Sequence, residues 1–217
     1  MDTAKALPLL SAEQLRVLGA LMEKCKTTPD YYPMTLNGLT AACNQKTSRK
    51  PVVQYDDSTI ISALNSLKIA GLISTATGGS IRSIKYKHNF AIVFPVVPAE
   101  VAIMCLLFLR GPQTPGEINT NSGRLYEFET LEEVQNTLEK LANETPAYIK
   151  QLPRKPGQKE VRYMHLFGEN ADDIEEEYLN EEPSKSNYQL EERLTKVEEE
   201  LAELKISFDK LMKELMG

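Results

Sequence analysis

The side chains that could do chemistry in this chain are mostly cations and hydroxyls within residues 1–97, a set suited to contacting phosphates and bases. A basic stretch follows the motif TLNGLTAACNQ, hydroxyl and amide groups recur on the next predicted helix, and more cations lie on the predicted hairpin after it. Each side chain alone is equally compatible with a solvated surface, but together they converge on one region. The candidate contacts with double-stranded DNA are Lys46, Arg49, Lys50, Ser58, Thr59, Ser62, Asn65, Lys68, Arg82, Lys85 and Lys87.

Groups suited to catalysis are scarce in the sequence. His88 and His165 fall at the ends of two predicted hairpins, in equivalent places, which favours packing or strand-end roles over a shared metal site. The sequence has no Gly-rich phosphate loop before a helix and no GxSxG motif, and its carboxylates cluster in the tail. We therefore expect no enzymatic activity, no catalytic residues, no metal site and no cofactor.

The charge of the chain is unevenly distributed. The 217 residues carry a net charge of −6, but residues 1–97 sum to +5, residues 98–168 to −1 and residues 169–217 to −10. The acidity therefore belongs to the tail and does not argue against nucleic-acid binding by the first 97 residues. Three cysteines without CxxC spacing indicate reduced thiols, and the amino terminus lacks the pattern of a signal peptide, so we expect a cytoplasmic protein.

Residues 90–109, FAIVFPVVPAEVAIMCLLFL, are apolar and carry a single charge at Glu100. The stretch is about long enough to cross a bilayer. Pro95 and Pro98 split it, however, and predict a strand end, a short linker and an apolar helix from Val101. We therefore expect no membrane segment.

The candidate contacts are positioned by a predicted series of three helices and a hairpin. SAEQLRVLGALMEKC has one apolar helical face and a cap at Ser11, and MTLNGLTAAC predicts a short helix introduced by Pro33 or Thr35. DDSTIISALNSLKIAG predicts a third helix, with apolar positions Ile60, Ile61, Leu64 and Leu67, a cap at Asp57 or Ser58 and a stop at Gly71. A hairpin with its turn at Gly78-Gly79 follows. This is the order of a winged helix-turn-helix domain.

The same order returns in residues 98–168. PAEVAIMCLLFLRG echoes the first helix, LEEVQNTLEKL echoes the third, and AYIKQLP with VRYMHLF form a second hairpin. Glu13 matches Glu100 at an offset of 87 and Leu64 matches Leu138 at an offset of 74, so the first copy has 13 extra residues. They predict an added basic loop at residues 44–55, beside the third helix.

The second copy differs in its charges. Its third helix carries Glu132, Glu133 and Glu139, which phosphates would repel, and its first helix is apolar nearly all round. We expect that helix to be buried against the other domain or another subunit, and the second domain to bind another protein. Its candidate wing cations are Arg154, Lys155, Lys159 and Arg162.

The tail begins with an acidic, Pro- and Ser-containing linker and ends in a heptad repeat. The repeat predicts a parallel homodimeric coiled coil, and an amphipathic helix folded back on the body is the alternative. The dimerisation positions are Leu190, Leu194, Val197, Leu201, Leu204, Phe208, Leu211 and Leu215.

Two long motifs, TTPDYYPMTLNGLTAACNQKTSRKPV at residues 27–52 and LRGPQTPGEI with RKPGQKEVRYMHL in the second domain, resemble the YceH-like family of uncharacterised bacterial proteins. The resemblance covers most of residues 11–168. It implies a tandem winged-helix fold and supplies neither an established activity nor catalytic residues. After TPGE the chain departs from the family pattern, because NTNSGRLYEF carries Arg124 alone, which argues against an anion site there.

The sequence thus predicts an α+β fold, mainly α, with winged helix-turn-helix domains at residues 1–97 and 98–168, an acidic linker at 169–187 and a coiled-coil helix at 188–217. The favoured hypothesis is a dimeric DNA-binding protein like a transcription regulator, with the first domain contacting DNA. The alternative is a protein-interaction scaffold that uses the tandem winged helices without DNA binding.

Overall fold

The computed structural model describes residues 6–76, 84–154, 160–169 and 205. The chain divides into two compact units, Met1–Glu175 and Glu176–Gly217, and every described residue except Lys205 belongs to the first. The predicted contacts Arg82, Lys155 and Lys159, the turn at Gly78-Gly79 and the heptad positions Leu190, Leu194, Val197, Leu201, Leu204, Phe208, Leu211 and Leu215 lie outside the described residues. They stay predictions.

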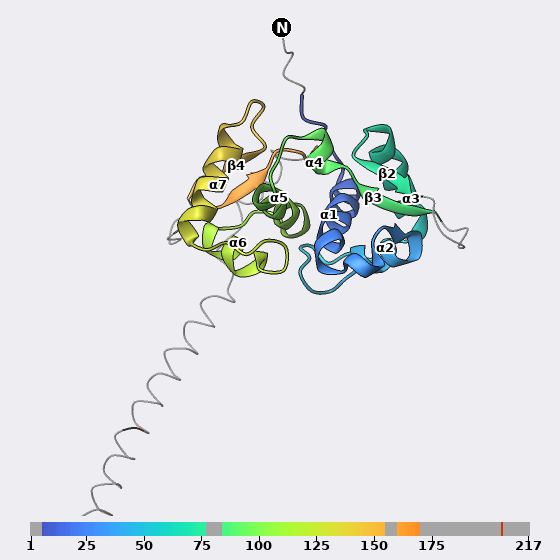
Figure 1. Cartoon of the computed structure of the whole chain (residues 1–217), viewed down its shortest axis with the longest axis horizontal. Coiled ribbons are helices and arrows are strands. Elements are labelled where there is room, and N and C mark those ends of the chain that lie inside the picture. Colours follow the sequence, from blue (N-terminus) through green and yellow to red (C-terminus); the bar gives the residue numbers. More distant parts are fainter. Residues whose placement is uncertain (1–5, 77–83, 155–159, 170–204, 206–217) are drawn as a thin grey trace, which may run out of the picture. The chain divides into compact units, whose positions relative to one another are not determined.

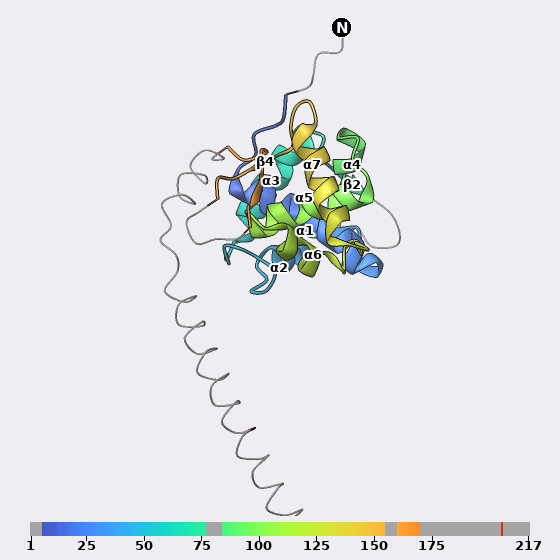
Figure 2. The same ribbon diagram turned by 90° about the vertical axis from the view of Figure 1, so that its left-hand side faces the viewer.

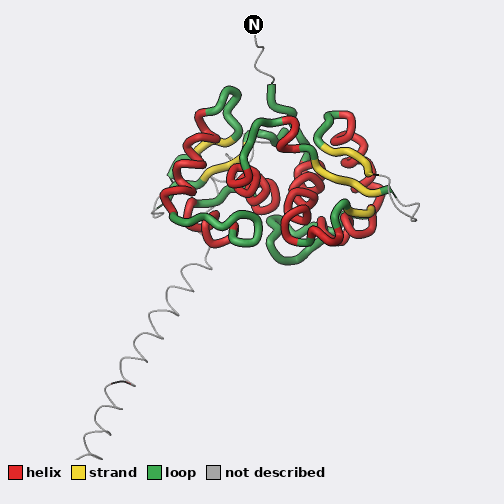
Figure 3. The backbone as a smooth tube through the Cα atoms, viewed as in Figure 1, coloured by secondary structure: helices red, strands yellow, loops and turns green. Residues whose placement is uncertain are grey.

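The fold is mixed α+β and mainly helical, with two small antiparallel strand groups among the helices (Figure 3). The first half runs α1 (Ala12–Thr27), a 3-10 turn (Pro29–Tyr31), β1 (Met34–Thr35), α2 (Leu36–Cys43), α3 (Asp57–Ile69), β2 (Ile73–Ala76) and β3 (Lys85–His88). The second half, preceded by α4 (Phe90–Val93), runs α5 (Pro98–Arg110), α6 (Pro115–Ser122), α7 (Leu131–Asn143), β4 (Ile149–Gln151) and β5 (Tyr163–His165).

The strands repeat the same pairing in both halves. In the first half the sheet order is β1-β3-β2, and β3 is antiparallel to both neighbours. In the second half β4 pairs antiparallel with β5, and Gln113, between α5 and α6, forms an antiparallel bridge to Tyr163 of β5. The three predicted helices and the hairpin of the first half are confirmed, and β1 is an addition.

Most of the predicted helix boundaries are confirmed. Ser11 caps α1 in a capping box with Gln14, Thr35 caps α2, and Gly71 follows α3 with a φ of +75°, the left-handed conformation that glycine adopts without strain. The second half has α6 in the place of α2, a helix that the repeated order implies but whose residues the sequence analysis did not identify. Its eight residues, PGEINTNS, are mostly polar and lack the apolar periodicity by which a helix is recognised.

The predicted cap of α3 at Asp57 or Ser58 is wrong. Asp56 caps the helix, because its carboxylate accepts a hydrogen bond from the backbone N–H of Thr59 at 2.8 Å. Asp57 instead accepts a hydrogen bond from the Thr40 hydroxyl at 2.7 Å, which ties the start of α3 to α2.

The predicted strand end and short helix within residues 90–109 are also corrected. Residues Phe90–Val93 form the helical turn α4, and α5 begins at Pro98 rather than at Val101. Proline is tolerated in the first helical turn because its missing N–H would have no partner there, and the Glu100 carboxylate accepts a hydrogen bond from Val97 N at 2.9 Å. Among the described residues, no helix is long and apolar enough to cross a membrane.

The two halves pack along α1 and α5, which lie side by side at the centre of the unit (Figures 1 and 2). Gly19 of α1 permits this approach, since a Cβ there would lie 2.9 Å from Leu109 Cγ and 3.2 Å from Phe108 Cβ of α5. Side chains from both halves form one buried core. The sequence left open whether the apolar first helix of the second domain packs against the other domain or against another subunit. The structure shows that this helix, α5, packs against the first half.

Candidate nucleic-acid interface

One face of α3 is buried and the opposite face is exposed and mostly polar. Ile60, Leu64 and Leu67 anchor the helix in the core. The predicted contacts Ser58, Ser62, Asn65 and Lys68 are exposed, and Thr59 is half-buried. Ser62, Asn65 and Lys68 have no side-chain partner among the described residues, so their donors and acceptors are available to a ligand.

The amino end of α3 is less available. The Ser58 hydroxyl donates to the Asp56 carboxylate at 2.9 Å, so this side chain is already engaged in the helix cap. Hydrogen bonds from Thr59 and then from Ser58 lower the pKa of Asp56. With Asp57 beside it, Asp56 gives this end of the helix a negative charge, which disfavours a phosphate there.

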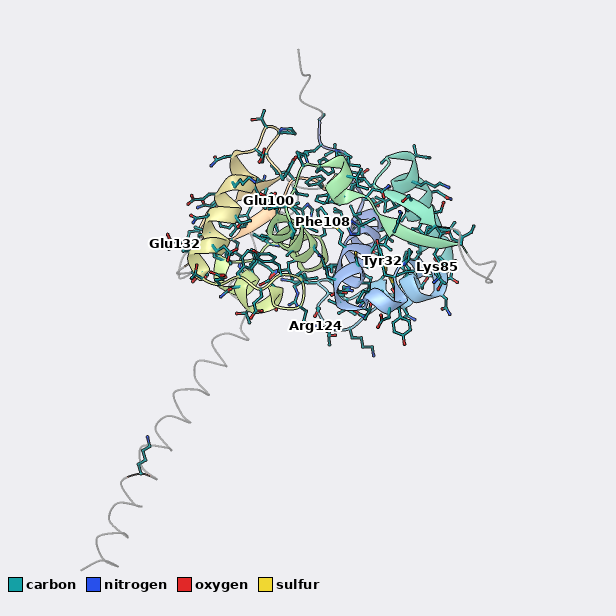
Figure 4. All side chains as sticks on the ribbon, in the orientation of Figure 1. Tyr32, Lys85, Glu100, Phe108, Arg124 and Glu132 are labelled. Atoms are coloured by element: carbon teal, nitrogen blue, oxygen red, sulfur yellow. The ribbon has the colours of Figure 1, made fainter. Side chains whose placement is uncertain are left out.

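Other lysines of the first half lie on the loop before α3 and on strand β3. Lys46 and Lys50 are exposed on the loop before α3, and Lys87 is exposed on β3 with Lys85 half-buried two residues earlier. Since side chains alternate along a strand, Lys85 and Lys87 lie on the same face of β3, and Tyr86 between them packs against the core. Figure 4 shows Lys85 at the end of the first half that is remote from α7.

Arg49 is not a surface cation, and the prediction that it contacts phosphate is wrong. It is 6% exposed. Its guanidinium donates to both Glu23 carboxylate oxygens, at 3.1 and 2.7 Å, and to the carbonyl oxygen of Ala42 at the end of α2. Burial alone would raise the pKa of Glu23, but hydrogen bonds and charge from Arg49, with help from Lys24, outweigh it and lower that pKa.

The added loop at residues 44–55 connects the two halves. The backbone N–H of Lys50 donates to the Leu109 carbonyl at 2.9 Å, and Arg110 of α5 donates to the Ser48 hydroxyl at 2.9 Å. Arg16 of α1, which sequence reasoning missed, is buried and donates to the carbonyl oxygens of Cys43 and Pro51. The loop is therefore fixed from the inside by buried arginines, and only its outer side presents lysines.

The corresponding surface of the second half is acidic. Glu132 and Glu139 are exposed on α7, and Glu133 accepts hydrogen bonds from Tyr126 and from the backbone N–H of Glu129. Figure 4 shows Glu132 at the end of the unit opposite to Lys85. This face has the wrong charge for a phosphate backbone.

The described wing cations of the second half are not equivalent. Arg162 donates from both terminal nitrogens to the Glu117 carboxylate, at 2.6 Å each, and also to the Pro112 carbonyl. It therefore holds β5 to the start of α6 and is not a free contact. Arg154 is exposed and remains available.

The two histidines end strands β3 and β5, in the equivalent places that the sequence predicted. Burial lowers the pKa of each to about 4, with a smaller contribution from Lys26 at His88, so both rings are neutral at pH 7. His165 packs edge-on against Phe108 at 5.0 Å between ring centroids. The described residues contain no group of three or more His, Cys, Asp and Glu side chains that could hold a metal ion.

The chain is similar to proteins of unknown function. The family model described as "Protein of unknown function, DUF480" matches residues 10–158. UPF0502 protein Shewmr4_1554 of Shewanella sp. (strain MR-4) is 43% identical, over 95% of this chain and 99% of that protein. A UPF0502 protein of Opitutus terrae is 48% identical over 75% of this chain and 71% of that protein. The match therefore spans both halves of the described unit, and the chain belongs to the DUF480, or UPF0502, family of uncharacterised bacterial proteins.

Proposed function

We propose that this protein binds double-stranded DNA through the first half, as a non-enzymatic cytoplasmic protein like a transcription regulator. The observation that carries the proposal is the exposed face of α3, on which Ser62, Asn65 and Lys68 have no side-chain partner among the described residues, together with the lysines of the preceding loop and of β3. A helix of this kind fits the major groove, while the flanking cations neutralise phosphates.

The element order supports this proposal. The series α1-β1-α2-α3-β2-β3 with sheet order β1-β3-β2 is that of a winged helix, in which the third helix enters the groove and the hairpin flanks it. The second half repeats the series, with the Gln113 bridge in the place of β1. We interpret the unit as two winged helices joined through α1 and α5.

Fluorescence anisotropy of the full-length protein with mixed-sequence duplex DNA, from low to physiological salt, tests the proposal. If Lys46, Lys50, Lys68, Lys85 and Lys87 each neutralise one phosphate, the slope of log affinity against log salt is about −4.5, from about −0.9 for each contact. Absence of binding at low salt would overturn the proposal.

Dimerisation through the heptads at residues 190–215 is part of the same proposal, and it would place two first halves on one DNA site. Analytical ultracentrifugation of the full chain and of a 1–175 truncation, which ends where the first compact unit ends, separates the possibilities. A dimer for the full chain and a monomer for the truncation is the expected result. A monomeric full chain would contradict this part.

The second candidate function is a protein-interaction scaffold. It is favoured by the acidic face of α7 and by an open pocket of about 470 Å³ next to it, lined by Tyr126, Glu132, Glu133 and Lys140 among others. A basic segment of another protein would suit this surface. Recovery of one stoichiometric partner on co-purification, with DNA binding absent at low salt, would decide for the scaffold.

A further inference from the structure

Two isoleucines stand on the exposed face of α3, where a soluble helix would ordinarily carry polar side chains. Ile61 is 42% exposed and Ile69 is 89% exposed. The sequence had grouped Ile61 with the core positions, and the structure corrects this: Ile60 is fully buried and Ile61, one residue on, is turned by about 100° toward solvent.

These isoleucines lie in one stripe with Asn65. Positions 61, 65 and 69 are spaced by four residues, so they share a face of the helix, and consecutive members are separated by about 6 Å along its axis. Along the helix the stripe therefore presents the apolar Ile61, the amide of Asn65 and the apolar Ile69, and Ser62 lies at its border. The Asn65 amide has no hydrogen-bond partner among the described residues, which leaves both its oxygen and its nitrogen free.

The chemistry of this stripe matches one kind of base pair. In the major groove adenine presents an acceptor at N7 and a donor at N6, which an asparagine amide meets with its nitrogen and its oxygen together. Thymine presents a methyl group, which only an apolar side chain contacts favourably. Guanine presents two acceptors and no methyl group, so a G·C pair fits neither Asn65 nor the isoleucines as well.

From this arrangement we propose that α3 selects A·T base pairs, with Asn65 contacting adenine and Ile61 contacting the methyl group of a thymine about two base pairs away. Lys68 on the same helix and Lys46 and Lys50 on the preceding loop provide the charge complementarity that makes DNA, rather than an apolar protein surface, the occupant of this face. The proposal deepens and rests on the DNA binding proposed above. It adds the kind of base pair that this face of α3 selects.

The experiment measures binding of the full-length protein to three duplexes of equal length at one salt concentration: alternating A·T, alternating A·U made with deoxyuridine, and alternating G·C. Deoxyuridine keeps the base pairing and removes only the thymine methyl group, so it isolates the contact assigned to Ile61. We expect affinity for the A·T duplex to exceed that for the G·C duplex by at least about tenfold, and the A·U duplex to fall between them.

Matched variants assign the effect to single side chains. Ile61→Ala is expected to abolish the difference between A·T and A·U while leaving the salt dependence unchanged, because it removes no charge. The same change at Ile92, which is 82% exposed on α4, is expected to change nothing. Asn65→Ala is expected to remove most of the A·T over G·C preference, whereas Asn136→Ala, on the exposed face of α7, is not.

The outcomes separate the two proposals. Salt-dependent binding of equal strength to A·T and G·C duplexes would overturn the A·T selection and leave DNA binding standing. Equal binding to A·T and A·U duplexes, or an A·U difference that persists in Ile61→Ala, would overturn the role of Ile61. Absence of binding to all three duplexes at low salt would overturn both proposals.

Discussion

α3 and α7 have the same length and the same place in the repeated order of elements, and they differ in what they expose. Both begin at an oxygen-bearing cap, Asp56 or Thr130, and both bury apolar residues at the same spacing. The buried large apolar residues are Ile60, Leu64 and Leu67 in α3 and Val134, Leu138 and Leu141 in α7, and α3 also buries Ala63.

The exposed positions of the two helices diverge. Ser58 and Asn65 of α3 correspond to Glu132 and Glu139 of α7 at the offset of 74 residues that relates the two helices. Burial fixes the apolar spacing, because a change there costs packing energy, while the exposed positions are free to carry different chemistry. The two halves therefore share a framework and differ in the charge and polarity that their exposed third helices present.

The largest expected effect concerns the loop that only the first half has. Arg49→Met should lower the free energy of unfolding by about 3 kcal/mol, because Glu23 and the Ala42 carbonyl lose the buried guanidinium and only Lys24 remains beside the carboxylate. Urea denaturation of the full-length protein measures it. Lys46→Met, on the same loop but exposed, should change it by less than about 0.5 kcal/mol. A loss below about 1 kcal/mol for Arg49→Met would show that the loop is not fixed as described.

A second prediction uses the buried histidine at the end of β5. The pKa of His165 is lowered to about 4 in the folded protein, against about 6.5 when unfolded, so the unfolded state binds more protons between these values. The contribution of the neutral His165 ring to the free energy of unfolding is therefore fully present above about pH 6.5, and it is lost as the pH falls toward 4.

Between pH 7 and pH 5, His165 alone should reduce the free energy of unfolding by about 2 kcal/mol. Denaturation curves of the wild type and of His165→Phe at both pH values isolate this contribution, since the variant lacks the titrating ring. The variant should lose correspondingly less stability over this interval. An identical loss in both proteins would contradict the burial of a neutral ring.

The smallest expected effect tests whether the two helices are capped alike. Asp56→Ala and Thr130→Ala should each lower the free energy of unfolding by about 1 kcal/mol, since each removes the acceptor for a backbone N–H in the first turn. Thermal denaturation of the two variants gives both values. Asp57→Ala, which removes the hydrogen bond from Thr40 but no cap, should lower the free energy of unfolding by less than Asp56→Ala does. A negligible effect at Asp56 would restore Asp57 as the cap.

Much of the framework followed from local pattern. Helix burial is periodic, so α1, α3, α5 and α7 were predictable, and the repeat predicted both hairpins. Among the candidate site residues, the failures were decided by distant partners. Arg49, on the loop before α3, looked like a surface cation because its carboxylate partner, Glu23, lies 26 residues earlier, on α1.

Ile61 was misplaced for a related reason. An apolar residue next to a buried one fits a helical pattern whether or not a neighbouring element covers it, and here Ile61 stays 42% exposed. The candidate site was therefore predictable as a region. Which residues belong to the site was not predictable, because the burial of single side chains depends on packing that the sequence pattern alone does not specify.

We propose that the first half contacts DNA and that the second half does not. The most direct measurement compares two full-length variants of equal net charge, Lys68→Glu with Lys87→Glu and Arg124→Glu with Arg154→Glu, by anisotropy with one duplex across a range of salt. All four side chains are exposed. The first variant should bind at least about tenfold more weakly, and its salt slope should be smaller in magnitude by about 1.8, for two lost phosphate contacts. The second should bind like the wild type. An equal loss in both variants, or a larger loss in the second, would contradict the account.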